Sequence, residues 1–351
     1  MLRSLPAEGS GVSERIRLAH GSGGELSRRL VHEVFLRYLL DPELARLEDS
    51  AVLSADGLDG ACGALAFTTD SYVVSPLEFP GGDIGKLAVC GTVNDLAAAG
   101  ARPLWMAAGW ILEEGLPLDT LERLVRSMAE WSAAAGIRVV TGDTKVVPQG
   151  LADGAYVNTS GVGWVPQGRC LGRQRVRSGD RVLVSGCLGD HGVAVMLARQ
   201  GISMSAHLVS DVAPLHGLVQ SLFDAEVDVR WLRDATRGGL GSVLCELAQG
   251  ANYGIEVEEQ SLPVRAEVSG AAELLGLDPL FIANEGKMVV VVPPEDAAAA
   301  LGAWNSHPLG RDAAVVGRVT EKHPGRVVSL TPYGTSRIVH LPAGELLPRI
   351  C

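Results

Sequence analysis

Short apolar segments that end at an aspartate or a glycine recur along this chain, and helical patterns follow several of them. In the first half, GALAFTTD indicates a strand that closes at Asp70, and KLAVCGTVNDLAAAG indicates a helix that stops at Gly100. In the second half, DRVLVSG and GIEVEE indicate strands, and RDATRGG leads into a helix. This alternation predicts a mixed α and β fold. Periodicity alone leaves a doubly wound parallel sheet and an α+β arrangement both open.

Two further segments complete the first half. Asp119 and Glu122 have the spacing of a capping box, which predicts a helix that begins there and runs to Gly136. IRVVTGD then indicates a strand that closes at Asp143, and AYVNTSGVGWV indicates another strand.

The chain has 351 residues, a length that favours two domains. The arginine- and glycine-rich segment PQGRCLGRQRVRSGD interrupts both periodicities and is the expected boundary. We therefore expect an N-terminal arm (1–19), an N-terminal domain (20–166), a C-terminal domain (178–340) and a flexible tail (341–351).

Composition excludes several classes of function. The formal charge of −11 opposes sequence-independent binding of nucleic acid. No apolar run approaches the roughly 20 residues of a membrane helix, and the first residues lack the apolar region of a signal peptide. The six cysteines form no CxxC pair, which argues against a zinc ribbon or a disulfide framework. We expect a cytoplasmic protein.

Acidic residues beside glycines or at strand ends are the first indication of chemistry. Converging carboxylates are the hard oxygen ligands that Mg²⁺ prefers, and Mg²⁺ in turn binds phosphate oxygens. Ordinary turn chemistry is the alternative for any single one of them. The candidates are Asp49, Asp70, Asp95, Asp143 and Asp234.

Lysine is used sparingly, at only four positions, and three of these fall in the segments GGDIGK, GDTK and NEGK. Because a compact ammonium suits a phosphate, we expect a phosphate contact, most of all from Lys145. Chance placement of Lys86, Lys145 and Lys287 on surface loops remains the alternative.

Two glycine-rich loops, HGSGG and ATRGGLGS, lead into helices, whose N-termini attract anions. Neither loop is a Walker A motif, and plain turns are an equally good explanation. The candidate nucleotide contacts are His20, Gly21, Gly23, Gly24, Gly238 and Gly239. His191, in GDHG, is a candidate base or phosphate donor, or a structural histidine.

The last residue is Cys351. A tail of eleven residues can carry its thiol over about 35 Å when extended. An accidental terminal cysteine is the alternative. Taken alone, these residues predict a Mg²⁺–nucleotide enzyme that uses a thiol on its tail.

The motifs, in their order, resemble the hydrogenase maturation factor HypE, the carbamoyl dehydratase family. The resemblance runs from Arg17 to Cys351 and rests on HGSGG, EDSAV, the block TTDSYVVSPLEFPGGDIGKLAVCGTVNDLAAAGARP, VVTGDTKVV, GDHG, RDATRGGL, NEGK and the terminal PRIC. It implies a two-domain α+β fold like that of aminoimidazole ribonucleotide synthetase. It also implies that the N-terminal domains pair into a homodimer with a β-barrel at the interface.

The resemblance further implies that ATP sits in the cleft near that interface, with HGSGG as a lid. Carried over by motif, the family's ligands of Mg²⁺-ATP are Asp49, Asp70, Asn94, Asp95, Asp143 and Asp234. The family's reaction converts a thiocarbamate on Cys351 into a thiocyanate, with ATP giving ADP and phosphate. We expect the carbamoyl oxygen to attack the γ-phosphate, with charge offset by Mg²⁺ and Lys145. Glu285, Asp95 and His191 are the candidate bases.

The implied partners are the carbamoyltransferase HypF, which loads Cys351, and the acceptor complex of HypC with HypD. Selenophosphate synthetase is the nearest rival, but it needs a cysteine near the first glycine loop, and no cysteine precedes Cys62. Purine-synthesis relatives or a thiamine-phosphate kinase would not need Cys351. A non-catalytic nucleotide-binding scaffold is the rival from another class.

Overall fold

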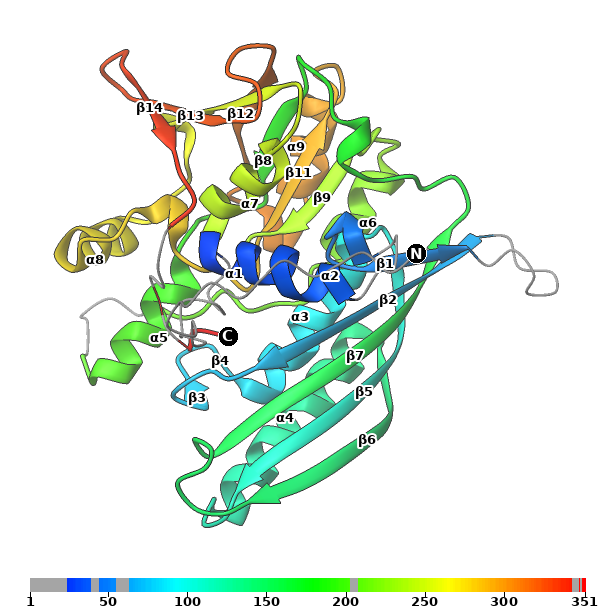
Figure 1. Ribbon diagram of the computed structural model, residues 1–351, viewed down its shortest axis with the longest axis vertical. Helices are drawn as coiled ribbons and strands as arrows, with labels where there is room; N and C mark the ends of the chain where they lie inside the picture. Colours follow the sequence, from blue (N-terminus) through cyan, green and yellow to red (C-terminus); the bar gives the residue numbers. More distant parts are fainter. Residues whose placement is uncertain (1–23, 39–43, 55–62, 203–207, 343–346, 348) are drawn as a thin grey trace, which may run out of the picture.

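The computed structural model describes residues 24–38, 44–54, 63–202, 208–342, 347 and 349–351. The expected arm and most of the HGSGG loop therefore lie outside the described residues. The chain forms two sheets that lie one above the other in Figure 1, with helix α3 running between them.

The N-terminal sheet has the strand order β1-β2-β7-β5-β6. Helices α3 (Ile84–Ala98) and α4 (Leu118–Ala135) cover one face, and no described helix of this chain covers the other (Figure 1). Its strands are β1 (Ala51–Ser54), β2 (Gly63–Tyr72), β5 (Arg102–Glu113), β6 (Arg138–Val147) and β7 (Ala155–Pro166), and the hairpin β3 (Glu78–Phe79)–β4 (Gly82–Asp83) precedes α3.

Helix α3 is apolar on nearly every side because it is buried between the two domains. Its start is fixed by the Asp83 carboxylate, which accepts hydrogen bonds from the backbone N–H groups of Gly85 and Lys86. Its end is followed by Gly100 at a φ of +72°, as the glycine stop signal predicts. Such a rigid, buried helix is a firm support for side chains in the cleft.

The C-terminal sheet has the strand order β14-β13-β10-β12-β8-β11-β9. Helix α7 packs on one face, and α6 and α9 pack on the other. Among the described strands, only the β10–β13 pair of this sheet is parallel, so the fold is mixed α and β and not a doubly wound parallel sheet. The bounds are β8 (Arg181–Val184), β9 (Trp231–Asp234), β10 (Gly254–Glu258), β11 (Met288–Val292), β12 (Ala314–Thr320), β13 (Val327–Leu330), β14 (Ser336–Val339), α5 (Asp190–Gln200), α6 (His216–Asp224), α7 (Gly239–Ala248), α8 (Ala266–Leu275) and α9 (Ala297–Asn305).

The remaining described helix, near the N-terminus, consists of α1 (Glu25–Leu30), a π-helical segment (Val31–Phe35) and α2 (Leu36–Tyr38). No helix among the described residues is long and apolar enough to cross a membrane.

Three local predictions are wrong. The residue that precedes α4 is Pro117, and the Asp119 carboxylate lies inside the helix, where it pairs with Arg123 one turn later at 3.3 Å. The capping-box spacing was therefore coincidental. Asp143 and Asp70 do not end strands, because β6 continues to Val147 and β2 continues to Tyr72. All three errors place a polar residue at an element's end when it lies within the element.

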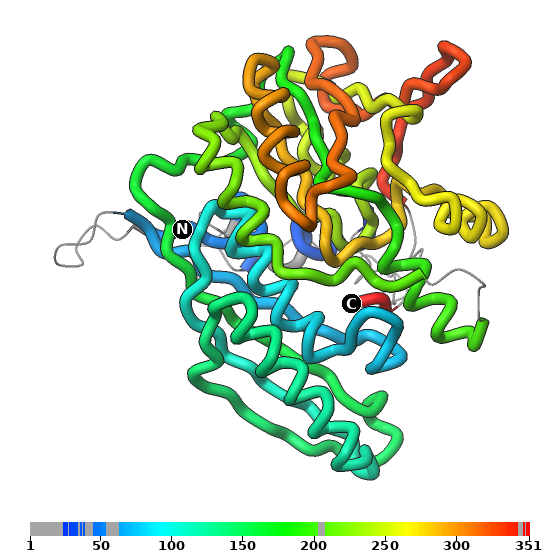
Figure 2. Tube along the Cα trace, turned by 180° about the vertical axis from the view of Figure 1, so that it is seen from behind, coloured from blue at the N-terminus to red at the C-terminus, as the bar shows by residue number. Residues whose placement is uncertain are grey.

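The described residues at the C-terminal end of the chain are docked against the rest of the protein, and the flexibility expected of the tail stays a prediction. Val73 donates its backbone N–H to the carbonyl oxygen of Cys351 at 3.1 Å, and Ser75 donates to that of Arg349 at 3.2 Å. Ile350 is buried in the core that α3 and α5 share. The C-terminus lies beside β3, β4 and α5 in both views (Figures 1 and 2). A short peptide with two buried apolar side chains, Leu347 and Ile350, and backbone partners is held without a helix or strand of its own.

Candidate active site

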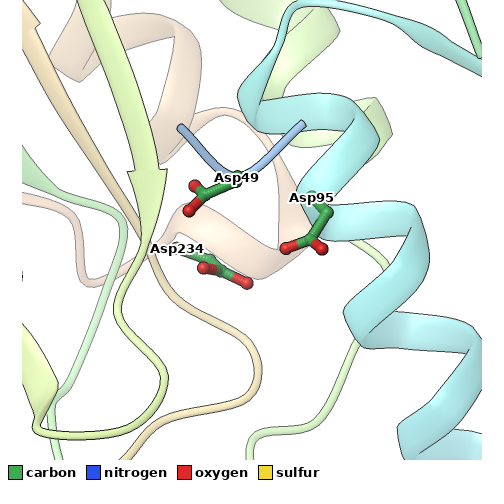
Figure 3. A group of neighbouring side chains, drawn as sticks. All are labelled: Asp49, Asp95 and Asp234. Atoms are coloured by element: carbon green, nitrogen blue, oxygen red, sulfur yellow. The ribbon is translucent and has the colours of Figure 1, made fainter. Parts of the chain in front are cut away.

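Three carboxylates from distant parts of the chain meet between the domains. Asp49 precedes β1, Asp95 lies on α3 and Asp234 ends β9. One oxygen of each lies within 4.8 Å of the others, and Figure 3 shows the three groups pointing toward one another. The sequence predicted this convergence, although Asp95 reaches the cluster from a helix.

Burial and mutual repulsion disfavour the charged form of these three carboxylates. Burial, more than any other effect, raises the pKa of Asp49 to about 6 and the pKa values of Asp95 and Asp234 well above their ordinary range. The carboxylates raise one another's pKa as well. The Arg233 guanidinium lies 2.8 Å from Asp49 and offsets part of this repulsion. A set of three buried acidic oxygens fits a hard divalent cation, which would remove the repulsion that remains.

Hydrogen bonds orient this cluster. The Thr68 hydroxyl donates to the Asp95 carboxylate at 2.6 Å, and Ser50 donates to the backbone carbonyl of Asp95 at 2.9 Å. Asp70, two residues beyond Thr68 on the same face of β2, has a raised pKa because of burial, and the charge of Arg237 partly offsets the rise. Asp70 thus extends the acidic surface from the cluster toward Arg237.

The charges of this acidic surface act on the terminal thiol. Burial raises the pKa of Cys351 well above its ordinary value, the charge of Arg237 opposes the rise, and the charges of Glu285 and Asp70 add to it. The docked thiol is therefore protonated near neutral pH. The roles assigned to Cys351 and Glu285 from the sequence stay predictions.

Two polar atoms here are buried without a hydrogen-bond partner: Glu285 Oε1 and the Tyr72 hydroxyl. Burial, together with the charges of Asp234 and Asp70, raises the pKa of Glu285 well above its ordinary value. Unpartnered buried polar atoms are unfavourable unless something binds them, so the pair indicates a place for a polar ligand.

The sequence analysis missed Tyr72 and Arg237. Their signals were an aromatic hydroxyl two residues after Asp70 and an arginine inside the second glycine loop.

His191 does not have a ring nitrogen directed at the thiol. Its Nδ1 lies 2.7 Å from the Ser210 hydroxyl, and its Nε2 lies 2.8 Å from the carbonyl oxygen of Ile350. The ring is fully buried, and burial lowers its pKa. His191 therefore holds the tail in place, and both of its ring nitrogens are occupied by partners within the protein.

Asn94 has hydrogen-bond partners outside the cluster. Its amide nitrogen donates to the carbonyl oxygens of Ala213 at 3.1 Å and Glu285 at 3.4 Å, and its oxygen accepts from the Leu215 N–H at 2.7 Å. Both groups of its amide thus attach α3 to other parts of the chain. Its role as a metal ligand stays a prediction.

Asp143 and Lys145 lie elsewhere in this chain. They pair with each other at 3.0 Å on the edge strand β6, and both side chains are about 70% exposed. In register, Asp143 lies opposite Gly109, whose partner on β7 is the exposed Asn158. That row faces away from α3, so these two residues occupy the face of the sheet opposite to Asp95.

The other predicted phosphate contacts have partners within the protein. Lys86 donates to the carbonyl oxygen of Gly81 at 2.8 Å, and Lys287 pairs with Asp211 at 2.8 Å. Gly238 precedes α7 with a φ of +75°, and a side chain at Gly239 would collide with backbone oxygens of residues 280–282. These glycines satisfy local packing at the α7 N-terminus, and their contact with a nucleotide stays a prediction.

Comparisons with known proteins agree with this architecture. Residues 47–165 match the family described as AIR synthase related protein, N-terminal domain, and residues 177–329 match the corresponding C-terminal domain. The chain is 52% identical over 338 residues to the carbamoyl dehydratase HypE of Rhodobacter capsulatus, with 96% of this chain and 98% of that protein covered. It is also similar to a solved HypE–HypF complex, with a TM-score of 0.82 and 45% identity over 89% of this chain and 99% of that chain. A solved HypE in complex with ATP matches with a TM-score of 0.79 and 44% identity over 95% of this chain and 98% of that chain.

Proposed function

The chain belongs to the HypE family of carbamoyl dehydratases, and from this premise we propose that it dehydrates a carbamoyl group with ATP during hydrogenase maturation. The observation that carries the proposal is the docked tail: the Ile350 carbonyl oxygen accepts a hydrogen bond from His191, and the charges of Arg237, Glu285 and Asp70 act on the Cys351 thiol. A substrate attached to that sulfur would lie beside a buried base and an acidic cluster. Neither a nucleotide sensor nor a purine-synthesis enzyme needs such a thiol.

We infer that Mg²⁺ accompanies ATP at Asp49, Asp95 and Asp234. Three buried carboxylate oxygens within 4.8 Å of one another fit such a cation, because it supplies the positive charge that they lack. When bound, it would neutralise charge on the triphosphate. Asp70, next to the cluster, would share this task. The lid His20–Gly24 and the Gly238–Gly239 turn stay predictions as nucleotide contacts.

The proposed reaction begins with a thiocarbamate on the Cys351 sulfur. Its carbonyl oxygen attacks the γ-phosphate, the bond from the γ-phosphorus to the bridging oxygen breaks and releases ADP, and the nitrogen gives one of its two protons to solvent, which leaves an O-phosphorylated imidate. The Glu285 carboxylate then takes the remaining N–H proton, the C–O bond breaks, phosphate leaves and the carbon–nitrogen triple bond forms. The burial that raises the pKa of Glu285 also makes its carboxylate a stronger base.

We infer that two chains pair through the uncovered face of the N-terminal sheet. Phe67, Val162 and Trp105 form one cross-strand row on this face, and Phe67 and Trp105 are nearly half exposed. A continuous apolar row on an uncovered sheet face is typical of an interface. In such a homodimer the two N-terminal sheets would close into the β-barrel that the resemblance implies. Asp143 and Lys145 would then lie at the interface and could reach the partner's cleft.

The partners follow from the chemistry. HypF would load the carbamoyl group onto Cys351, and a complex of HypC with HypD would accept the cyano group. Both transfers require the docked tail to leave its site, and we place the reactions in the cytoplasm.

Mass spectrometry of the C-terminal peptide tests the proposal directly. The chain is incubated with HypF, carbamoyl phosphate and ATP, and the adduct on Cys351 is identified. A cyano adduct supports the dehydratase. A carbamoyl adduct that persists in the presence of ATP contradicts it. Omitting ATP is the matched control, and it should leave only the carbamoyl form.

A further inference from the structure

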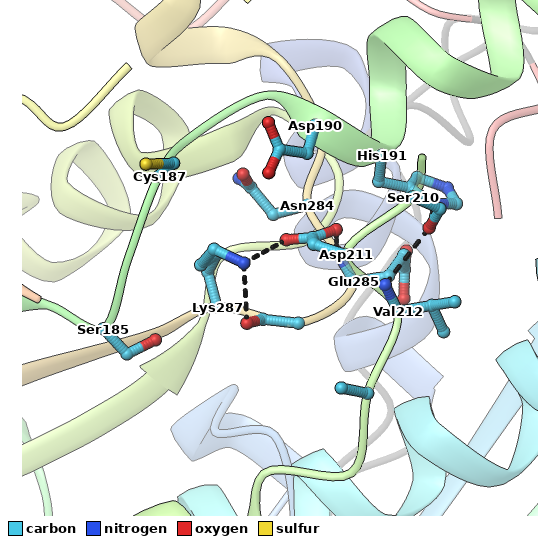
Figure 4. Close-up of polar contacts among 12 residues, drawn as sticks. Ser185, Cys187, Asp190, His191, Ser210, Asp211, Val212, Asn284, Glu285 and Lys287 are labelled. Carbon is cyan, nitrogen blue, oxygen red and sulfur yellow. Dashed lines mark hydrogen bonds and ion pairs between the residues drawn. The ribbon is translucent and has the colours of Figure 1, made fainter. Parts of the chain in front are cut away.

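Residues 210–213, which we call the bridging segment, touch three functional parts of the molecule. They contact the loop that carries Glu285, the histidine that holds the tail, and helix α3 through Asn94. Figure 4 shows Ser210 and Asp211 in one group with His191 and Glu285. The position of this segment therefore bears on both the proposed base and its substrate.

The segment holds Glu285 by its backbone. Asp211 Oδ1 accepts a hydrogen bond from the Glu285 N–H at 3.0 Å, and the Ala213 N–H donates to the Glu285 carbonyl oxygen at 3.4 Å. At the next position, a side chain in place of Gly286 would collide with the Asp211 carbonyl oxygen. This close approach explains the glycine of the NEGK motif.

A buried ion pair fixes Asp211. Lys287 Nζ lies 2.8 Å from Asp211 Oδ2 and also donates to the Gly286 carbonyl oxygen at 3.1 Å, as Figure 4 shows. The side chains of Lys287 and Asp211 are only 10% and 4% exposed. Burial alone would raise the pKa of Asp211, but the charge and hydrogen bond of Lys287, together with the hydrogen bond from the Glu285 N–H, hold it below its ordinary value, so this carboxylate remains ionised.

The same segment holds the tail. Because the Ile350 carbonyl oxygen can only accept, His191 Nε2 carries the hydrogen, and Nδ1 of the neutral ring accepts from the Ser210 hydroxyl. The Val212 N–H donates in turn to Ser210 Oγ at 3.1 Å. An unbroken series of hydrogen bonds thus joins the bridging segment to the residue before Cys351.

A buried ion pair is an inefficient source of stability, because desolvating two charges offsets most of their attraction. We propose that Asp211 and Lys287 are a positioning pair for the dehydration step. They lock the bridging segment so that the Glu285 carboxylate and the group carried by Cys351 meet in one geometry. This inference rests on the proposed function and assigns Lys287 a task other than the phosphate contact that its motif indicated.

The test uses Asp211→Asn, Lys287→Met and the double variant in the full-length chain with HypF. After the chain is loaded with carbamoyl, ATP is added and formation of the cyano adduct is timed in a single turnover. We expect each single variant to slow this step by about tenfold or more, since small misplacements are costly to catalysis. ATP affinity should stay within about threefold, since the pair does not touch the acidic cluster. The double variant should be no slower than the slower single one, because the two side chains act as a unit.

Two further measurements separate positioning from general damage. Alkylation of the unloaded Cys351 should accelerate in both single variants and in Ser210→Ala, because each loosens the hold on the tail. The control is Glu256→Gln with Arg318→Met, another ion pair with a buried carboxylate, on β10 and β12, at 2.6 Å. This control should change neither rate.

The proposal is overturned if the single variants form the cyano adduct at the wild-type rate. It is equally overturned if ATP affinity falls in parallel with that rate, since the pair would then merely maintain the fold. A wild-type chain that never forms the cyano adduct would count against the proposed dehydratase. In that case the alkylation rates of Cys351 still report on the bridging segment by themselves.

Discussion

Asp234 illustrates how much a single carboxylate of the cluster lowers the stability of the metal-free protein. Burial and the neighbouring charge of Asp49 both raise its pKa. We expect Asp234→Asn to raise the stability of the metal-free protein by about 1 kcal/mol or more, because one of three mutually repelling groups is removed. The same change should abolish stabilisation by Mg²⁺ and formation of the cyano adduct.

Thermal unfolding with and without Mg²⁺ measures both effects for Asp234→Asn. Asp119→Asn is the matched control, since that carboxylate is exposed on α4. The metal assignment fails if Mg²⁺ stabilises the Asp234 variant as much as it stabilises the wild type.

Asn94 gives a second prediction at the residue scale. In Asn94→Asp, an acidic oxygen would replace the amide that donates to the carbonyl oxygens of Ala213 and Glu285. We expect a loss of stability of about 1–3 kcal/mol, since buried acceptors are left unpaired. A metal ligand would instead tolerate this change, because a carboxylate binds Mg²⁺ at least as well. Urea unfolding, together with the Mg²⁺ concentration needed for half-maximal activity, distinguishes the two roles.

At the scale of elements, the docked tail is the part whose position matters most. It has no helix or strand of its own, and its hold comes from Val73, Ser75, His191 and the buried side chain of Ile350. This arrangement can be both specific and reversible, as successive transfers to and from Cys351 require.

We expect His191→Phe to release the tail more often, because the Ile350 carbonyl oxygen loses its donor. A loss of about 1–2 kcal/mol corresponds to a five- to thirtyfold faster alkylation of Cys351 by iodoacetamide. Peptide mass spectrometry after timed labelling measures this rate. The exposed Cys170 serves as an internal reference, and His32→Phe, at an exposed position, serves as the control variant. Unchanged labelling of Cys351 in the His191 variant would show that the tail is held by other contacts.

At the scale of the whole molecule, the uncovered sheet face predicts the quaternary structure. We expect Phe67→Glu to convert a dimer into a monomer, because a charge would be buried in the apolar row with Val162 and Trp105. Light scattering after size-exclusion chromatography measures the mass. Leu274→Glu, on α8 and 83% exposed, is the matched control and should remain dimeric. A Phe67 variant with the mass of two chains would place the interface elsewhere.

Mixing two inactive variants tests whether Lys145 acts across that interface. Lys145→Met retains Cys351, and Cys351→Ser retains Lys145. If the lysine serves the partner's cleft, a mixed dimer contains one complete site. Each mixed dimer should then have about half of the activity of a wild-type dimer. If Lys145 acts on its own chain, the mixture stays inactive in the cyano-adduct assay.

The order of motifs along the chain determined the family and the mixed α and β class, and it indicated the three carboxylates that the fold brings together. Short-range patterns suffice for such conclusions, because glycine stops such as Gly100 and strand-end acids such as Asp234 act through local geometry. The roles of Glu285 and Cys351 in the reaction come from the motif resemblance and stay predictions.

Only the tertiary structure decided which neighbours each of these residues meets. Asn94 and Asp95 are adjacent in sequence, yet a helix turns consecutive side chains by about 100°, so one anchors α3 and the other joins the cluster. His191 and Lys287 carry groups suited to catalysis, but burial beside Ile350 and Asp211 makes them structural partners of the tail and the bridging segment. The residue type determines the chemistry of a side chain, whereas its role depends on charges and hydrogen-bond partners that come from distant parts of the chain.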